Sequence, residues 1–133
     1  MNTRITYEYR DGANYRFHAD VVLADAMTDE LWARIRAACQ DGEMFIAHQV
    51  ALPEVFGFLP GDHIYAPEFC HEGYPFEEDT DHCWHGFGPD PDVWELTGDP
   101  PTGDLTVERL VEAFESAAMA GWKVFDPAER FGL

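Results

Sequence analysis

The chain has 133 residues, the length of one domain, and 46% hydrophobic and 14% aromatic residues are enough to bury a core. Twenty-six Asp and Glu face eight Lys and Arg, for a net charge of −18. This charge repels phosphates and anionic lipids, so we expect no direct binding to nucleic acid or membranes, and favour cations and basic proteins as partners.

The start of the chain predicts two strands and a tight turn. Residues 4–10 alternate between apolar and polar side chains, which is typical of a half-buried strand. The next four residues, 11–14, read Asp-Gly-Ala-Asn, and this is turn chemistry because Gly and Asn tolerate positive φ. Alternation resumes over residues 15–21, so we expect an antiparallel hairpin.

Two helices have clear boundary signals. The first is expected to begin with Thr28 as its N-cap and to end near Asp41, followed by Gly42. The second is expected to start at the N-cap Thr106 and to end at Gly121. The predicted inward stripe of the first helix is Leu31, Trp32, Ile35, Ala38 and Cys39. The predicted inward positions of the second are Val107, Leu110, Val111, Phe114, Ala117 and Ala118.

The region between the helices is rich in Pro, Gly and aromatic residues, which excludes a long helix there. We predict one domain over 1–133, with 53–104 as a loop-rich acidic segment within it. Short strands are expected through residues 45–46, 82–87 and 93–96. This order predicts an α+β fold, in which two helices cover one face of a small antiparallel sheet and acidic loops lie at an edge or on the other face.

Positions 37–108 contain no Lys or Arg but hold sixteen acidic residues. On a folded surface, such groups could imitate the phosphates of a nucleic acid and enter a basic groove on another protein. The predicted partner-binding residues are Glu72, Glu77, Glu78, Asp79, Asp81, Asp90, Asp92, Glu95, Asp99 and Asp104. Solubility alone is the alternative interpretation of these charges.

Cysteines and histidines between positions 70 and 85 raise the alternative of a zinc site, because zinc prefers thiolate and imidazole ligands. The candidate ligands are Cys70, His71, His82, Cys83 and His85, with His63 as a further donor. Their spacing matches no standard zinc motif, and an ordinary core role for Cys83 is the competing interpretation. A carboxylate site for Mg²⁺ or Ca²⁺ is a further alternative, with Glu77, Glu78, Asp79 and Asp81 as ligands.

No catalytic motif accompanies these groups. Ser116 is the only serine and falls within the second predicted helix, and no glycine-rich phosphate loop is present. Carboxylates near histidines could act in acid–base chemistry, but nothing supplies a nucleophile, so we do not expect an enzyme. The chain also lacks an apolar run typical of a membrane span or signal peptide. With three cysteines, an odd number, these features predict a cytoplasmic protein with reduced thiols.

Four stretches resemble a group of small, acidic, uncharacterised proteins of bacteria and their mobile elements. They are residues 7–15 (Tyr-Glu-Tyr-Arg-Asp-Gly-Ala-Asn-Tyr), residues 41–46 (Asp-Gly-Glu-Met-Phe-Ile), residues 81–85 (Asp-His-Cys-Trp-His) and residues 105–114. The resemblance implies a cytoplasmic single domain and carries no established activity.

The leading hypothesis from the sequence is a small acidic inhibitor that occupies a basic nucleic-acid-binding site on a partner protein. Anti-CRISPR and anti-restriction proteins use this strategy, and the likeness to them is one of size and charge. The alternative is a cytoplasmic metal-binding or metal-dependent protein that uses the Cys70, His71, His82, Cys83 and His85 cluster. No cofactor is expected under the leading hypothesis.

Overall fold

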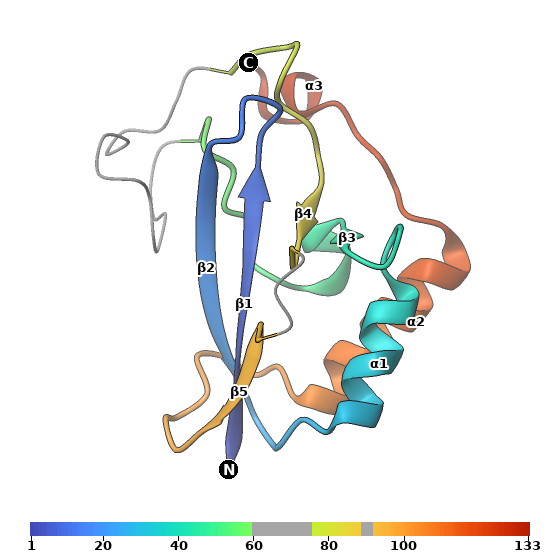
Figure 1. Ribbon diagram of the computed structural model, residues 1–133. Coiled ribbons are helices and arrows are strands. Elements are labelled where there is room, and N and C mark those ends of the chain that lie inside the picture. The colour runs from blue at the N-terminus through green and yellow to red at the C-terminus, as the bar shows by residue number, and fades with distance from the viewer. Residues whose placement is uncertain (60–75, 89–91) are drawn as a thin grey trace.

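A computed structural model describes residues 1–59, 76–88 and 92–133 (Figure 1). Its elements in chain order are β1 (Asn2–Arg10), β2 (Arg16–Leu23), α1 (Asp29–Ala38), β3 (Met44–Phe45), the 3-10 helix η1 (Ala47–Val50), β4 (His85–Gly86), β5 (Trp94–Thr97), α2 (Val107–Ala120) and α3 (Pro127–Phe131). The strands form one antiparallel sheet in the order β2-β1-β4-β3, and β5 also pairs with β1. The predicted α+β fold is confirmed.

The β1–β2 hairpin is the main strand pair of the sheet, and its turn forms as predicted. One carboxylate oxygen of Asp11 accepts hydrogen bonds from the backbone N–H groups of Ala13 and Tyr15, both at 2.9 Å. Asn14 has a φ of 72°, which explains an asparagine there. On β1, odd-numbered side chains are buried and even-numbered ones face outward. The sheet therefore has a core face and an outer face.

Both predicted N-caps are confirmed, because Thr28 Oγ1 accepts from the N–H of Leu31 and Thr106 Oγ1 from that of Arg109. The predicted end of the first helix is wrong, since α1 ends at Ala38 instead of near Asp41. The reason is a two-residue turn: Asp41 and Gly42 both have positive φ, which a type I′ turn requires.

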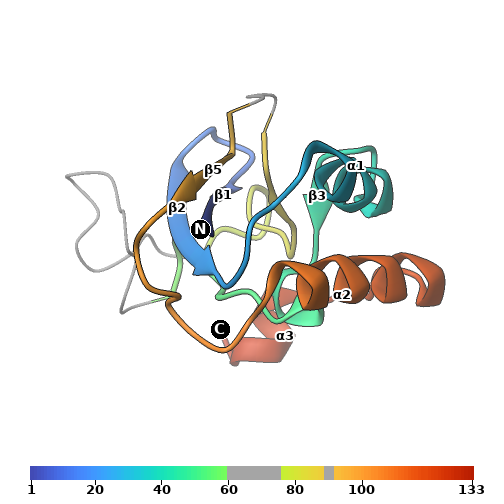
Figure 2. The same ribbon diagram turned by 90° about the horizontal axis from the view of Figure 1, so that it is seen from below.

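The two long helices lie together beside β3, on the side of the molecule away from β2 (Figure 2). Phe114 of α2 packs against Phe45 and Phe87, with ring centroids 5.2 and 5.9 Å away. Trp32 of α1 meets Phe87 at 4.8 Å. The inward position predicted for Ala118 is wrong, because that residue is exposed beyond the end of this packing.

The core face of the hairpin is closed by the segment 52–59, which overlaps the start of the predicted loop-rich segment. Phe56 lies edge-on to Tyr9 with centroids 5.0 Å apart, and the Tyr7 hydroxyl donates to the carbonyl of Pro53. Phe131 of α3 packs on Phe56 from the other side, at 5.8 Å. None of the helices in the described ranges has both the length and the apolar character to cross a membrane.

Candidate functional site

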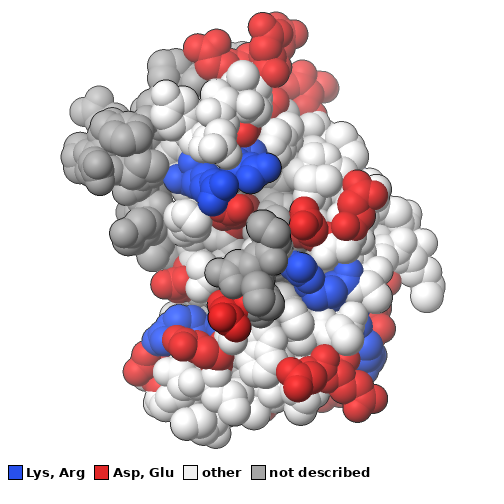
Figure 3. Space-filling view, in the orientation of Figure 1, with Lys and Arg blue, Asp and Glu red and all other residues white. Residues whose placement is uncertain are grey.

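The predicted partner-binding acids do not form one continuous surface. Glu77, Glu78 and Asp79 lie exposed on a turn at one end of the molecule, whereas Glu95 and Asp99 lie on and after β5 at the other. Asp104 is exposed at the same end as Glu95 and Asp99, Asp92 is exposed before β5, and Glu72 and Asp90 lie outside the described residues. On the face drawn in Figure 3, acidic groups alternate with basic ones.

Asp81 has a structural role in the fold. Its carboxylate accepts a hydrogen bond from the Tyr9 hydroxyl and another from the backbone N–H of Glu77, at 2.8 Å. The same Tyr9 oxygen accepts the backbone N–H of His82 at 3.2 Å. Asp81 therefore fastens the 77–81 turn to β1 and is only partly exposed.

Glu95 and Asp99 share one cation. The Arg4 guanidinium pairs with Glu95 at 2.8 Å and with Asp99 through its other terminal nitrogen. These two carboxylates are 65% and 60% exposed, so the bridges are screened by water and contribute little to stability. Part of the charge at this place is thus already neutralised.

Exposed acids lie on several segments that meet at the end of the molecule where β1 starts and β5, α1 and α2 have a terminus, as the ribbon in Figure 1 shows. The Asn2 side chain joins two parts of it, donating to the carbonyl of Asp99 and accepting from the N–H of Asp25. A parallel bridge between Ala24 and Thr106 then brings the start of α2 beside them. We call this set the acidic end; it consists of Asp25, Asp29, Glu30, Glu95, Asp99, Asp104 and Glu108.

Local electrostatics suit acids at this end. Asp29, Glu30 and Glu108 occupy the first turns of the helices, where unpaired N–H groups give a positive potential. Arg34 lies between the helices: its pKa is raised first by the hydrogen bond to Glu115 and further by the charges of Glu30 and Glu108. The two helix starts therefore hold their acids near one another.

The sequence prediction missed four members of the acidic end, Asp25, Asp29, Glu30 and Glu108. Asp29 and Glu30 lie before the stretch without Lys or Arg that directed the prediction. A helix-capping signal identified their position in α1, but only the Ala24–Thr106 bridge places them beside residues 99–108. That long-range contact has no local sequence signal.

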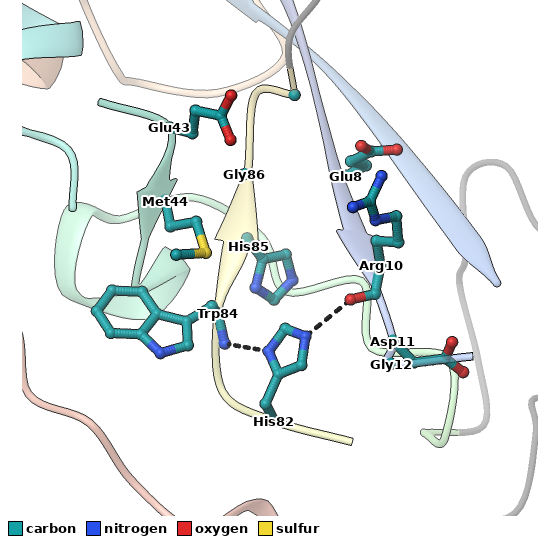
Figure 4. A pocket seen from close by; sticks show the side chains of 11 residues that line it. Glu8, Arg10, Asp11, Gly12, Glu43, Met44, His82, Trp84, His85 and Gly86 are labelled. Atoms are coloured by element: carbon teal, nitrogen blue, oxygen red, sulfur yellow. Dashed lines mark hydrogen bonds between the residues drawn. The ribbon is translucent and has the colours of Figure 1, made fainter. Parts of the chain in front are cut away.

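A second feature is a cleft of about 270 Å³ on the outer face of the sheet (Figure 4). Met44, Gly86 and Glu8 are aligned across β3, β4 and β1 by the strand register. Because the middle residue has no side chain, the surface is hollow between its neighbours. The residues that line the cleft are Glu8, Arg10, Asp11, Gly12, Glu43, Met44, His82, Trp84, His85, Gly86 and Gly88.

His82 is fully engaged by the backbone at the edge of this cleft. Its Nε2–H donates to the carbonyl of Arg10 at 2.7 Å, and its Nδ1 accepts from the N–H of Trp84 at 3.0 Å. Both hydrogen bonds are shown in Figure 4. This pattern needs the neutral ring with the proton on Nε2, so neither nitrogen is available as a metal ligand.

His85 is buried below the cleft with 1% exposure. Its Nε2 accepts the backbone N–H of Val55 at 2.9 Å, and Nδ1 has no hydrogen-bond partner among the described residues. Burial, with smaller contributions from the charges of His82 and His48, lowers the pKa of His85 to about 3. The ring is therefore neutral at physiological pH.

The metal alternatives gain no geometric support in the part of the chain that is described. Among the described residues, no three His, Cys, Asp or Glu side chains lie close enough together to hold a metal ion. Neither His82, Cys83 and His85 nor the acids of residues 77–81 form such a group. Burial raises the pKa of the Cys83 thiol, which disfavours the thiolate. The candidates His63, Cys70 and His71 lie outside the described residues.

No protein-family model matches the chain, and no significant match was found to a curated protein or to a solved structure. Residues from three stretches, 7–15, 41–46 and 81–85, contribute to the lining of the cleft.

Proposed function

We propose that this protein binds the basic, nucleic-acid-binding surface of a partner protein and blocks it, with the acidic end as the contact surface. The observation that carries the proposal is the convergence of acids from four chain segments on one end of a protein with a net charge of −18. Folding brings these like charges together, and their mutual repulsion lowers the stability of the protein. Because the charges are kept despite this cost, we infer that they serve a function.

The acidic end has features that suit a basic groove. Asp25, Asp29, Glu30, Asp104 and Glu108 are exposed on three different segments. Asn2 holds the backbone at Asp25, and Thr106 caps the helix that carries Glu108, so the backbone is fixed at two places beneath these acids. A fixed array of negative charge speeds association with Arg and Lys and excludes the nucleic acid that competes for them.

The test is a pull-down with tagged protein from lysate of the source cell, eluted in steps of increasing salt. The proposal predicts capture of a nucleic-acid-handling protein that elutes at high salt and is displaced by duplex DNA or RNA. Displacement of the protein by nucleic acid distinguishes occupation of the nucleic-acid site from nonspecific electrostatic association. A partner that binds the protein and nucleic acid at the same time would contradict the proposal, and so would the absence of any basic partner at low salt.

A further inference from the structure

The cleft on the outer face of the sheet is a separate feature from the acidic end, and its lining indicates what it accepts. Glu8, Asp11 and Glu43 contribute three carboxylates, against one guanidinium from Arg10. The His82 ring at the edge adds at most one further positive charge, which the three carboxylates still outnumber. The net charge of the lining is therefore negative, and it favours a cation over an anion.

The apolar part of the lining is equally specific. Figure 4 shows Glu43 and Met44 on the β3 side of β4 and Glu8 and Arg10 on the β1 side, with Trp84 beside Met44. A thioether and an indole suit the methylene groups of an amphipathic stem, and an aromatic face also attracts a cation. The Glu8 side chain is only 14% exposed, so a cation reaching it leaves part of its water behind.

We propose that this cleft binds a guanidinium or primary ammonium group carried on a short apolar stem. The charged group is held between Glu8 and Glu43 above Gly86, and the stem lies against Met44 and Trp84. Charge-assisted hydrogen bonds to the two carboxylates provide the specificity. The binding is independent of the acidic end, so it can be tested with small molecules without a protein partner.

Titration of the whole protein, followed through backbone amide and indole NMR signals at low salt, tests this. The probes are N-acetyl-arginine amide and its neutral isostere N-acetyl-citrulline amide. We expect saturable shifts at Gly86, Gly88 and the Trp84 indole with the arginine probe, and none with citrulline. Ethylguanidine, which carries the same single guanidinium charge on a short apolar stem without the amide groups, identifies the source: tighter binding than the blocked arginine indicates a small metabolite, and the reverse order a protein side chain.

Two variants and one control locate the binding. Gly86→Ala fills the floor of the cleft, and its new Cβ meets nothing closer than 3.4 Å, so the fold is retained. Glu8→Gln removes one carboxylate charge. Each is expected to weaken arginine binding roughly tenfold. Glu112→Gln makes the same charge change at an exposed position on α2 and is expected to leave it unchanged.

Amide spectra of each variant establish that it is folded before the titrations are compared. Equal binding of the arginine and citrulline probes would overturn the proposal, because charge would then have no part in recognition. Equal weakening by E8Q and E112Q, or no effect of G86A, would also overturn it, since either result means diffuse attraction to an acidic surface.

Discussion

His85 of β4 accepts the backbone N–H of Val55 on its Nε2, so a buried imidazole helps to fix the segment that closes the core over β1. Around it pack Phe56, at 4.6 Å between centroids, and Tyr9, at 5.7 Å. A charged ring could not accept the Val55 hydrogen bond and would be stranded among aromatic rings. The core therefore depends on a histidine that stays neutral.

This dependence predicts a loss of stability in acid. The pKa of His85 falls from 6.5 in the unfolded chain to about 3 in the fold, so between these values the unfolded state binds the extra proton. Stability from this group is complete above pH 6.5 and declines as pH falls toward 3, by up to about 1.4 kcal/mol per pH unit. Urea unfolding at pH 7.5 and pH 5 measures the loss.

His85→Gln is the control, because glutamine offers an acceptor for Val55 but does not titrate. The protonation of surface acids is common to both proteins and cancels when their pH dependences are compared. We expect the variant to have a lower free energy of unfolding at pH 7.5 than the unmodified protein, but to lose less of that free energy between pH 7.5 and pH 5. The same pH dependence in both proteins would show that His85 is not the group responsible.

Tyr9→Phe should destabilise the fold more than Tyr7→Phe. The Tyr9 hydroxyl both donates to Asp81 and accepts from the N–H of His82, whereas the Tyr7 hydroxyl makes one hydrogen bond, to Pro53. Removing the Tyr9 hydroxyl leaves Asp81 and the N–H of His82 each without a hydrogen-bond partner, at a cost of about 1–3 kcal/mol. Removing the Tyr7 hydroxyl leaves only the Pro53 carbonyl without one. Urea unfolding gives both values, and an equal cost would contradict the structural role assigned to Asp81.

Gly57→Ala should be strongly destabilising. A Cβ at this position would lie 2.1 Å from the ring of Phe17, which is 1% exposed and has no free space to move into. We expect a loss of about 1–3 kcal/mol from overpacking. Gly98→Ala is the matched control, because its Cβ meets nothing within 4 Å. If the two variants melt at the same temperature, segment 52–59 does not pack on β2 as described.

Cys39 and Cys83 should resist thiol reagents in the native protein. Both are buried, and burial raises the pKa of Cys39 to about 12 and that of Cys83 above its usual range. The reactive thiolate is therefore scarce and shielded. Maleimide labelling mapped by mass spectrometry should modify both residues only after urea is added. Rapid labelling of either one in native buffer would contradict its burial.

The elements that were predicted correctly have local signals. The hairpin follows from alternation and the turn chemistry of Asp11 and Asn14, and both long helices follow from a threonine cap before an apolar period. Two local signals were overlooked. Asp41-Gly42 is a typical hairpin-turn dipeptide, and Asp126-Pro127 with Gly132 brackets α3 with a cap, a helix-starting proline and a left-handed glycine.

The candidate sites could not be predicted in the same way, because they arise from contacts between distant residues. The cleft exists because strand register aligns Glu8, Gly86 and Met44, which lie as much as 78 positions apart in the chain. The acidic end needs the Ala24–Thr106 bridge. Composition shows that the chain is strongly acidic, but long-range pairing of residues decides which acids meet, and that pairing has no periodic pattern or motif in the sequence.

The most direct test of the acidic end compares two triple variants that each raise the net charge by three. D29N/E30Q/E108Q neutralises the acidic end, and E77Q/E78Q/D79N neutralises the exposed turn at the opposite end of the molecule. Both are checked for folding, since the lost helix-end charges cost about 0.3–1 kcal/mol each. The measurement is the affinity of each for the basic partner captured from lysate, at low salt.

We expect the first variant to bind the partner roughly tenfold more weakly or worse, and the second to change affinity by less than about twofold. Equal losses would mean that net charge alone drives association, and a loss confined to E77Q/E78Q/D79N would move the contact surface to the other end. Either result would contradict the acidic end as the binding surface.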